Sequence, residues 1–359
     1  MMDSTQQLHA HGQSIWLDNI TRNLLTSGTL ARYIDQLSVT GLTSNPTIFD
    51  KAIEGSDAYD ETIRTSAESG EPLLFELALD DLRAAADLFR PVHEQTAGMD
   101  GWVSLEVSPD LANDATMTVA EAVRLHAQAE RPNLFIKIPG TREGIDAIEE
   151  AIFRGVPVNV TLLFSCRQYL AAAEAYLRGI ERRIAAGSDA AVRSVASLFV
   201  SRWDVAAAGA VPPELRNRLG IAVATQTYAA YCELLASDRW RRLQDAGADP
   251  QRLLFASTGT KDPAASDVLY VEALAADMTI NTMPDTTLLA FADHGRVAGL
   301  LRDDGGDVDE TLARFTQAGI DLDVLALRLQ QEGTAAFSAS WAKLLACIAR
   351  KRELLAAAQ

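Results

Sequence analysis

Eight short runs rich in β-branched and other apolar residues recur along this 359-residue chain, and alanine- and leucine-rich stretches with helical patterning lie between most of them. Such alternation is typical of parallel βαβ units, in which a crossover helix follows each strand. Eight strands suit a closed (β/α)8 barrel better than an open doubly wound sheet. The runs predicted to be strands are residues 14–18, 38–44, 101–108, 133–138, 156–163, 194–201, 252–257 and 277–282.

The segments between these runs predict one barrel with additional helices. The main predicted helices are residues 72–97, 116–130, 142–153, 165–186, 219–246 and 284–293. No Pro/Gly/Ser-rich linker divides the chain, so we expect a single domain over residues 1–359, with a long amphipathic C-terminal helix, 321–355, packing across the barrel. No GxGxxG motif follows the first run, so the phosphate fingerprint of a dinucleotide-binding sheet is missing.

Polar and apolar residues alternate in four of the predicted strands. Successive side chains of a strand point to opposite faces, and because one face must meet the helices, the polar face must point into the barrel. The residues predicted to face inward are Ser104, Glu106 and Ser108; Asn133, Phe135 and Lys137; Asn159 and Thr161; and Thr279 and Asn281, with Met278 and Ile280 facing the helices. The polar residues also come late in their strands, at the end where barrel enzymes carry their active sites.

Composition excludes several classes of protein. The net charge of −17 argues against binding to a nucleic-acid backbone, which needs a basic face. Cys166, Cys232 and Cys347 are far apart and form no CxxC, and the histidines are scattered, so we expect no metal site and a reducing compartment. The start lacks an apolar signal segment and no window reaches a spanning length of about 20 apolar residues. We therefore expect a cytoplasmic protein that does not bind membranes.

Lys137 lies in the otherwise apolar run NLFIKIPGT, residues 133–141. An isolated ammonium group placed in an apolar interior loses its proton or needs a partner. An inward lysine near the mouth of a barrel is what Schiff-base chemistry requires: the neutral amine attacks a ketone, and the resulting iminium withdraws electrons so that a C–C bond can break. Positioned acids and bases must then transfer protons, and Asp18 and Glu106 are the candidates.

Each of these residues also has a purely structural interpretation. Lys137 and Glu106 could form an interior ion pair that only fills polar space. Asp18 could be a helix N-cap or a turn residue, and Asn45, which precedes Pro46, could be a turn residue before a helix that starts with proline. The agreement in side-chain direction among several strands is what favours the chemical interpretation.

Five ordered motifs resemble those of transaldolases, and the resemblance extends from about residue 14 to 350 and is closest to the longer bacterial form. The motifs are LTSNPTIF (42–49), SLEVSP (104–109), FIKIPGT (135–141), NVTLLFS (159–165) and INTMPDTTL (280–288). The resemblance implies a (β/α)8 barrel and a cofactor-free ping-pong reaction of the non-oxidative pentose phosphate pathway. A dihydroxyacetone unit would move from sedoheptulose 7-phosphate to glyceraldehyde 3-phosphate, giving erythrose 4-phosphate and fructose 6-phosphate. The partners would be sugar phosphates, and the protein a monomer or homodimer.

The resemblance implies catalytic roles for four residues. Lys137 would be the Schiff-base lysine. Asp18 would be the acid/base at the substrate hydroxyl whose deprotonation breaks the C–C bond. Glu106 would work with Thr161 through a water during formation and breakdown of the carbinolamine.

It also implies a set of substrate contacts. Asn45 and Asn159 would hydrogen-bond the dihydroxyacetone hydroxyls. In the segment SLFVSRW (197–203), Ser197 would contact the substrate, Phe199 would form a wall and Arg202 would hold the phosphate, although Arg202 could instead form a surface ion pair.

The segment after the seventh predicted strand departs from the family pattern. Shorter transaldolases carry a phosphate-binding arginine there, whereas this chain has FASTGTKDP (255–263). Ser257, Lys261 or the glycine-containing backbone could supply the phosphate site, since phosphate commonly binds in the loops after strands seven and eight of such barrels. Lysine is a point charge without the bidentate fork of arginine, so the mode of phosphate recognition stays open.

Two other functions fit the same residues. A Schiff-base aldolase would release free dihydroxyacetone, and the fate of the covalent intermediate (hydrolysis, or a wait for an acceptor aldehyde) separates it from a transferase. A non-catalytic barrel would only bind sugar phosphates, and the presence of Lys137, Glu106 and Asp18 together weighs against it.

Overall fold

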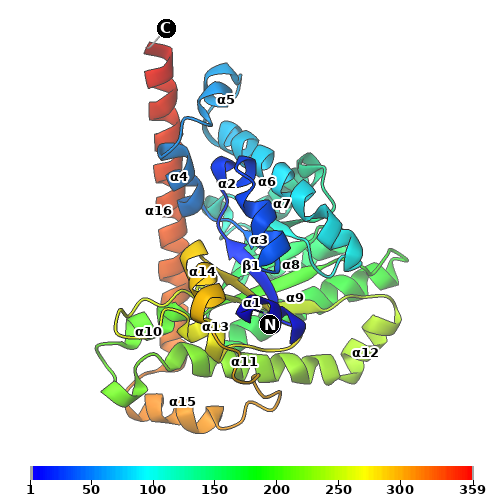
Figure 1. Ribbon diagram of the computed structural model, residues 1–359. Helices are drawn as coiled ribbons and strands as arrows, with labels where there is room; N and C mark the ends of the chain where they lie inside the picture. The colour runs from blue at the N-terminus through cyan, green and yellow to red at the C-terminus, as the bar shows by residue number, and fades with distance from the viewer. Residues whose placement is uncertain (1–2, 358–359) are drawn as a thin grey trace.

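Eight parallel strands and the helices around them make up the computed structural model, which describes residues 3–357 (Figure 1). Neighbouring strands follow the order β2-β1-β8-β7-β6-β5-β4-β3. The strands are β1 (Ser14–Asp18), β2 (Val39–Thr43), β3 (Val103–Glu106), β4 (Leu134–Pro139), β5 (Val158–Leu163), β6 (Ser194–Phe199), β7 (Gln251–Ala256) and β8 (Ile280–Met283). All eight predicted strands are confirmed, and most are shorter than predicted.

Backbone pairing at Gly41 and Trp102 joins the two ends of the sheet, β2 and β3. The Leu42 N–H donates to the Trp102 carbonyl at 2.9 Å, next to a parallel bridge between Gly41 and Trp102. A Cβ atom on Gly41 would lie 2.7 Å from the Trp16 indole, so only glycine allows this close approach. The sheet thus closes into the predicted (β/α)8 barrel.

The helices surround the barrel and add a long C-terminal arm. They are α1 (Ser4–Ala10), α2 (Arg22–Thr26), α3 (Thr29–Gln36), α4 (Pro46–Glu54), α5 (Asp60–Thr65), α6 (Gly70–Gln95), α7 (Ala115–Ala129), α8 (Arg142–Phe153), α9 (Cys166–Ala185), α10 (Ser201–Ala207), α11 (Leu219–Ala236), α12 (Asp238–Asp245), α13 (Leu269–Ala273), α14 (Asp285–His294), α15 (Val308–Gln317) and α16 (Leu322–Ala357). The single predicted helix 219–246 is wrong. It breaks at Ser237, whose extended backbone ends α11 and whose hydroxyl caps α12 by accepting from the Trp240 N–H at 3.1 Å.

The predicted inward and outward faces are confirmed in β3, β4 and β5 as far as Thr161. Outward residues such as Leu105, Ile136 and Val158 join the large core cluster between sheet and helices. Phe135 instead joins an interior cluster and stacks on Trp102, with ring centroids 4.0 Å apart. In these three strands, the alternation of side chains along the sequence therefore predicted correctly which side chains fill the barrel.

The predicted faces of the last strand are wrong. Ile280 belongs to the interior cluster, and the Thr282 hydroxyl meets that of Thr43 at 2.8 Å, whereas Met283 packs in the outer core. Met278 has φ of +56°, which interrupts the extended chain, and the strand starts only at Ile280. Since successive side chains alternate, Asn281 points away from the interior, and its side-chain oxygen accepts from the Thr258 hydroxyl at 2.8 Å.

A buried polar network lies beneath the interior cluster, at the amino ends of the strands. Asp100 accepts hydrogen bonds from the Ser14 hydroxyl and, at 2.8 Å, from the Trp16 indole N–H. The Arg252 guanidinium lies 3.7 Å from the same carboxylate and donates to the Thr279 carbonyl at 2.8 Å. The network thus ties β1 and β7 together at the closed end of the barrel.

Helix α16 follows the side of the barrel and passes α4 and α5 (Figure 1). The Gln330 amide donates to the carbonyl of Gly140, just after β4, at 2.8 Å, and to the carbonyl of Leu162, in β5, at 3.0 Å. Farther along, Lys343 forms a 2.5 Å ion pair with Asp50 of α4. These contacts agree with the predicted packing of the C-terminal helix across the barrel.

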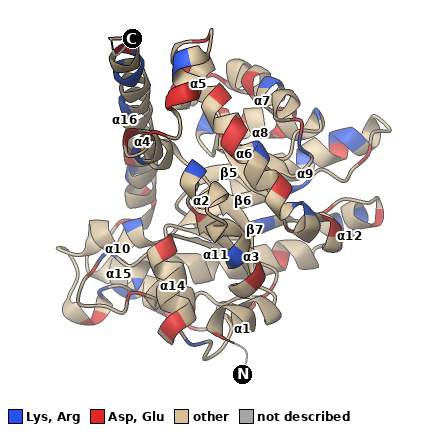
Figure 2. Ribbon diagram, turned by 45° about the horizontal axis from the view of Figure 1, so that its top comes forward, with Lys and Arg blue, Asp and Glu red and all other residues tan. Residues whose placement is uncertain are grey.

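Charged residues lie mainly on the outer helices, and the central strands are mostly uncharged (Figure 2). Among residues 3–357, no helix is both long and apolar enough to cross a membrane.

Candidate active site

A cavity of about 330 Å³ opens at the carboxyl ends of the strands. Nine of the eleven residues predicted for the site line it, whereas Glu106 and Asn159 do not. The nine are Asp18, Asn45, Lys137, Thr161, Ser197, Phe199, Arg202, Ser257 and Lys261. They come from β1, β4, β5 and β6 and from the segments that follow β2, β6 and β7, so the fold brings together residues that are far apart in the sequence.

Lys137 projects from β4 into this cavity and is 5% exposed. Its Nζ donates to the Ser44 carbonyl at 3.0 Å. Glu106 is its register neighbour on β3, yet no carboxylate among the described residues lies within 4 Å of Nζ. The interpretation as a direct Lys137–Glu106 ion pair is therefore wrong, and the amine stays accessible from the cavity.

Glu106 and Thr161 are buried and keep unused hydrogen-bonding capacity. Within residues 3–357, neither Oε2 of Glu106 nor Oγ1 of Thr161 has a hydrogen-bond partner. Burial raises the pKa of Glu106 to about 7; the positive charge of Lys137 opposes this rise and the negative charge of Asp18 adds to it. A carboxyl group with this pKa exchanges a proton readily near neutral pH.

We expect Glu106→Gln to stabilise the fold more at pH 8 than at pH 5. The folded-state pKa of about 7 exceeds the ordinary value of 4.5, so the folded protein binds more protons than the unfolded chain between these pH values, and wild-type stability falls as pH rises through this window. The variant lacks this loss, which amounts to ~3 kcal/mol. Urea denaturation at both pH values measures the difference, with Glu214→Gln on the exposed η2 turn (Pro213–Leu215) as control. An equal effect of Glu106→Gln at both pH values would contradict the raised pKa.

Asp18 ends β1 at the rim of the cavity. Its carboxylate accepts a hydrogen bond from the Thr43 hydroxyl at 2.9 Å. Burial raises its pKa, against the lowering effects of Lys137, Thr43 and Lys261. Thr21, not Asp18, caps α2, so the interpretation of Asp18 as a helix cap is wrong.

The two predicted asparagines have different surroundings. Asn45 caps α4, accepting from the Ile48 N–H at 3.1 Å, so its structural interpretation is confirmed, although the residue also lines the cavity. Asn159 is fully buried; its amide donates to the Ser104 hydroxyl at 3.1 Å and accepts from the Ser197 hydroxyl at 2.7 Å. Asn159 thus orients Ser197, and its contact with a substrate hydroxyl stays a prediction.

Phe199 and Arg202 form one wall of the cavity. The Arg202 guanidinium carbon lies 5.5 Å from the centre of the Phe199 ring, and Phe199 in turn contacts Phe164, with centroids 5.3 Å apart. Burial lowers the pKa of Arg202, and the negative charge of Glu332 opposes this. Arg202 takes part in none of the ion pairs within residues 3–357, so the interpretation as a surface ion pair is not supported.

The segment after β7 completes the rim. Ser257 has φ of +57°, and its hydroxyl meets that of Ser201 at 2.9 Å. Thr258 donates to the Thr282 carbonyl at 2.9 Å, which ties the segment to β8. Lys261 follows, exposed and lining the cavity.

Several residues of the wall were not predicted from the sequence, among them Thr43, Lys51, Thr282 and Phe337. Thr282 was missed because the faces of β8 were assigned in reverse. Lys51 stands on α4, inside a helix whose start was recognised but whose cavity-facing side was not. Phe337 comes from α16, and no local pattern relates that helix to the strand ends.

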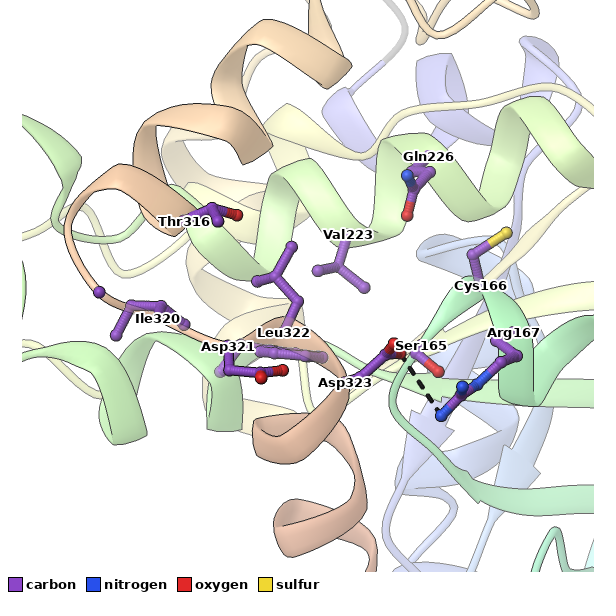
Figure 3. Close-up of a pocket in the computed structure, with 12 residues that line it drawn as sticks. Ser165, Cys166, Arg167, Val223, Gln226, Thr316, Ile320, Asp321, Leu322 and Asp323 are labelled. Carbon is purple, nitrogen blue, oxygen red and sulfur yellow. Dashed lines mark ion pairs between the residues drawn. The ribbon is translucent and has the colours of Figure 1, made fainter.

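A second cavity, of about 590 Å³, lies between α9, α11 and the connection from α15 to α16 (Figure 3). Arg167 and Asp323 form a 3.4 Å ion pair on its wall. It contains none of the predicted site residues, so the cavity at the strand ends is the candidate active site.

Comparisons with known proteins show what the whole chain is similar to. A family model described as "Transaldolase/Fructose-6-phosphate aldolase" matches residues 15–348. A relative named transaldolase from Acidothermus cellulolyticus is 44% identical over 98% of this chain and 98% of its own length. Proteins of the same name from Saccharopolyspora erythraea (46% identical, 93% of both chains) and Thiobacillus denitrificans (45%, 97% of this chain and 100% of the relative) are similarly close.

Proposed function

This chain belongs to the transaldolase/fructose-6-phosphate aldolase family, and we propose that Lys137 is its Schiff-base amine, through which a dihydroxyacetone unit moves from a ketose phosphate to an aldose phosphate. The chain is an enzyme of the transaldolase class in the non-oxidative pentose phosphate pathway, as its nearly full-length relatives with that name indicate. One observation carries the assignment of Lys137: its amine is buried, opens to the cavity and forms no ion pair with any residue in 3–357.

The first half-reaction forms and uses an iminium. The Lys137 amine adds to the C2 carbonyl of the ketose, and loss of water from the carbinolamine gives the iminium. Asp18 takes the proton of the C4 hydroxyl, the C3–C4 bond breaks, and its electron pair moves into the iminium. The aldose phosphate leaves, and an enamine of dihydroxyacetone stays on the lysine until it adds to the aldehyde of the acceptor. The raised pKa of Asp18 makes that carboxylate a better proton acceptor than an exposed one.

Glu106 and Thr161 serve the steps that add and remove water. Their unpartnered oxygens are able to bind a water molecule beside the reacting carbon. The pKa of Glu106, about 7, lets the residue donate a proton to the departing hydroxyl and recover it during hydrolysis of the product.

The substrate phosphate binds at the cationic rim. Arg202 and Lys261 carry the charge, and Ser257 offers a hydroxyl and a backbone N–H. The free cysteines Cys166, Cys232 and Cys347 support a reducing compartment such as the cytoplasm. The monomeric or homodimeric state stays a prediction.

The same site would support an aldolase that releases dihydroxyacetone, an activity that the family's description includes. The difference lies in whether water reaches the covalent intermediate before an acceptor does.

Incubation with fructose 6-phosphate and borohydride is expected to leave a stable adduct on Lys137, because borohydride reduces the iminium to a secondary amine. Peptide mass mapping locates the adduct. Absence of an adduct on Lys137 in active enzyme would overturn the assignment. With erythrose 4-phosphate added and borohydride omitted, glyceraldehyde 3-phosphate and sedoheptulose 7-phosphate should accumulate; steady release of dihydroxyacetone without an acceptor would instead identify an aldolase.

A further inference from the structure

The candidate active site carries a local positive charge in an acidic protein. The whole chain has a net charge of −17, yet the wall of this cavity holds Lys51, Lys137, Arg202 and Lys261 against one carboxylate, that of Asp18. Such a local reversal of charge concentrates anions in the cavity.

Lysine is concentrated in this cavity. The chain has only five lysines among its 32 basic residues, and three of the five line this wall. The other two form ion pairs outside it: Lys343 with Asp50 at 2.5 Å, and Lys351 with Asp60 at 2.8 Å. Arginine supplies nearly all other positive charge in the chain. The preference for lysine at this cavity therefore indicates a requirement of the site itself.

Lys51 is a positively charged residue of the cavity wall that the sequence motifs did not predict as a site residue. It stands on α4, which follows β2, while Arg202 and Lys261 follow β6 and β7. Within the described part of the chain, neither Lys51 nor Lys261 forms an ion pair or a side-chain hydrogen bond. Both are exposed, so their ammonium groups are free to meet an anion in the cavity.

Arg202 differs from these lysines because its surroundings hold it in place. It lies on the Phe199 ring, and its Nη1 is 3.4 Å from where a Cβ of Gly333 on α16 would be. The guanidinium is a rigid planar fork, whereas an ammonium on a four-carbon stem is a point charge that follows its partner. The rim therefore combines one fixed cation with two adjustable ones.

We propose that Lys51 and Lys261 form an adjustable phosphate clamp beside the fixed Arg202, so that one cavity accepts phosphates at different distances from the carbon bound to Lys137. This inference rests on the proposed function. The two ketose substrates carry the phosphate on C6 and on C7, so with C2 fixed at Lys137 the phosphate sits one carbon farther out in the longer sugar. Lys51 and Lys261 follow β2 and β7, which are three strands apart in the sheet, so two flexible side chains approach the cavity from different sides.

Lys51→Gln is expected to raise KM for both fructose 6-phosphate and sedoheptulose 7-phosphate about tenfold, as loss of one charge-assisted hydrogen bond does, and to lower kcat by less than about threefold. Lys51→Arg keeps the charge but stiffens the head group, and should change the ratio of kcat/KM between the two sugars by about threefold or more. Arg241→Gln on α12, an exposed cation outside the cavity, controls for the lost charge and should match wild type.

Borohydride trapping of unphosphorylated dihydroxyacetone separates this inference from the proposed function. Lys51→Gln should trap it on Lys137 as wild type does, because no phosphate is involved, while inorganic phosphate should inhibit the variant less. Wild-type KM values in Lys51→Gln, or reduced trapping of dihydroxyacetone, would overturn the role of Lys51 as a phosphate ligand. A raised KM with an unchanged substrate ratio in Lys51→Arg would overturn the adjustable clamp. Failure of wild-type enzyme to form any adduct would instead reject the proposed function.

Discussion

Lys137→Arg is expected to lose turnover by a factor on the order of 10³ or more and to form no adduct with fructose 6-phosphate under borohydride. Arginine keeps the positive charge but stays protonated at any working pH, so it has no free electron pair with which to attack a carbonyl. The fold should survive, because the side chain enters a cavity of about 330 Å³ and needs no new space in the core.

Lys343→Arg is the matched control for this substitution. It makes the same change on α16, outside the cavity, and keeps a cation opposite Asp50. Both variants should unfold at wild-type denaturant concentrations, and only Lys137→Arg should be inactive in a coupled assay of glyceraldehyde 3-phosphate. Turnover of Lys137→Arg near the wild-type rate would show that the residue acts only as a structural charge.

Asp100→Ala is expected to destabilise the protein by about 3–5 kcal/mol, because it leaves the Arg252 guanidinium charged and buried without its carboxylate. The side chains of Asp100 and Arg252 are 5% and 6% exposed. The Ser14 hydroxyl and the Trp16 indole N–H lose their acceptor as well, and each buried donor without a partner adds to the loss.

Equilibrium urea denaturation measures this effect, and Asp87→Ala is the control. Asp87 forms a 2.7 Å ion pair with Arg131, but more than half of its side chain is exposed, so its removal should cost only about 0–1 kcal/mol. Asp100→Asn keeps the shape of the side chain and should fall between the two, which gives a measurable variant if Asp100→Ala does not fold. Equal losses for the Asp100 and Asp87 variants would contradict a stabilising role for the buried network.

The strand pattern was predictable where the chain stays extended. The period of two placed Glu106, Lys137 and Thr161 on the inner face because β3, β4 and β5 run without interruption up to those positions. The prediction failed in β8 because apolar Ile280 fills the interior there, while polar Asn281 lies on the other face and accepts a hydrogen bond from the Thr258 hydroxyl. A polar residue that finds a buried partner outside the barrel leaves no periodic signal in the sequence. The break between α11 and α12 at Ser237 was missed because helix-forming residues continue on both sides of it.

Separate motifs pointed to most of the candidate site, but not to its shape. Nine of the eleven predicted residues line one cavity, since parallel strands end on the same side of a barrel. Asn159 pairs in register with Lys137 but does not line that cavity, and its side chain is bonded to Ser104 and Ser197 instead.

By itself, the sequence determined the barrel, the inward lysine and the carboxylates near it, because local periodicity encodes which face of a strand a side chain occupies. Only the tertiary structure decided that Lys137 has no ion-pair partner in the described part of the chain, that burial raises the pKa of Glu106 to about 7, and that Lys51 and Phe337 complete the wall. These properties depend on distances and burial between segments far apart in the chain, and α4 and α16 supply the last of them by bringing Lys51 and Phe337 to the cavity.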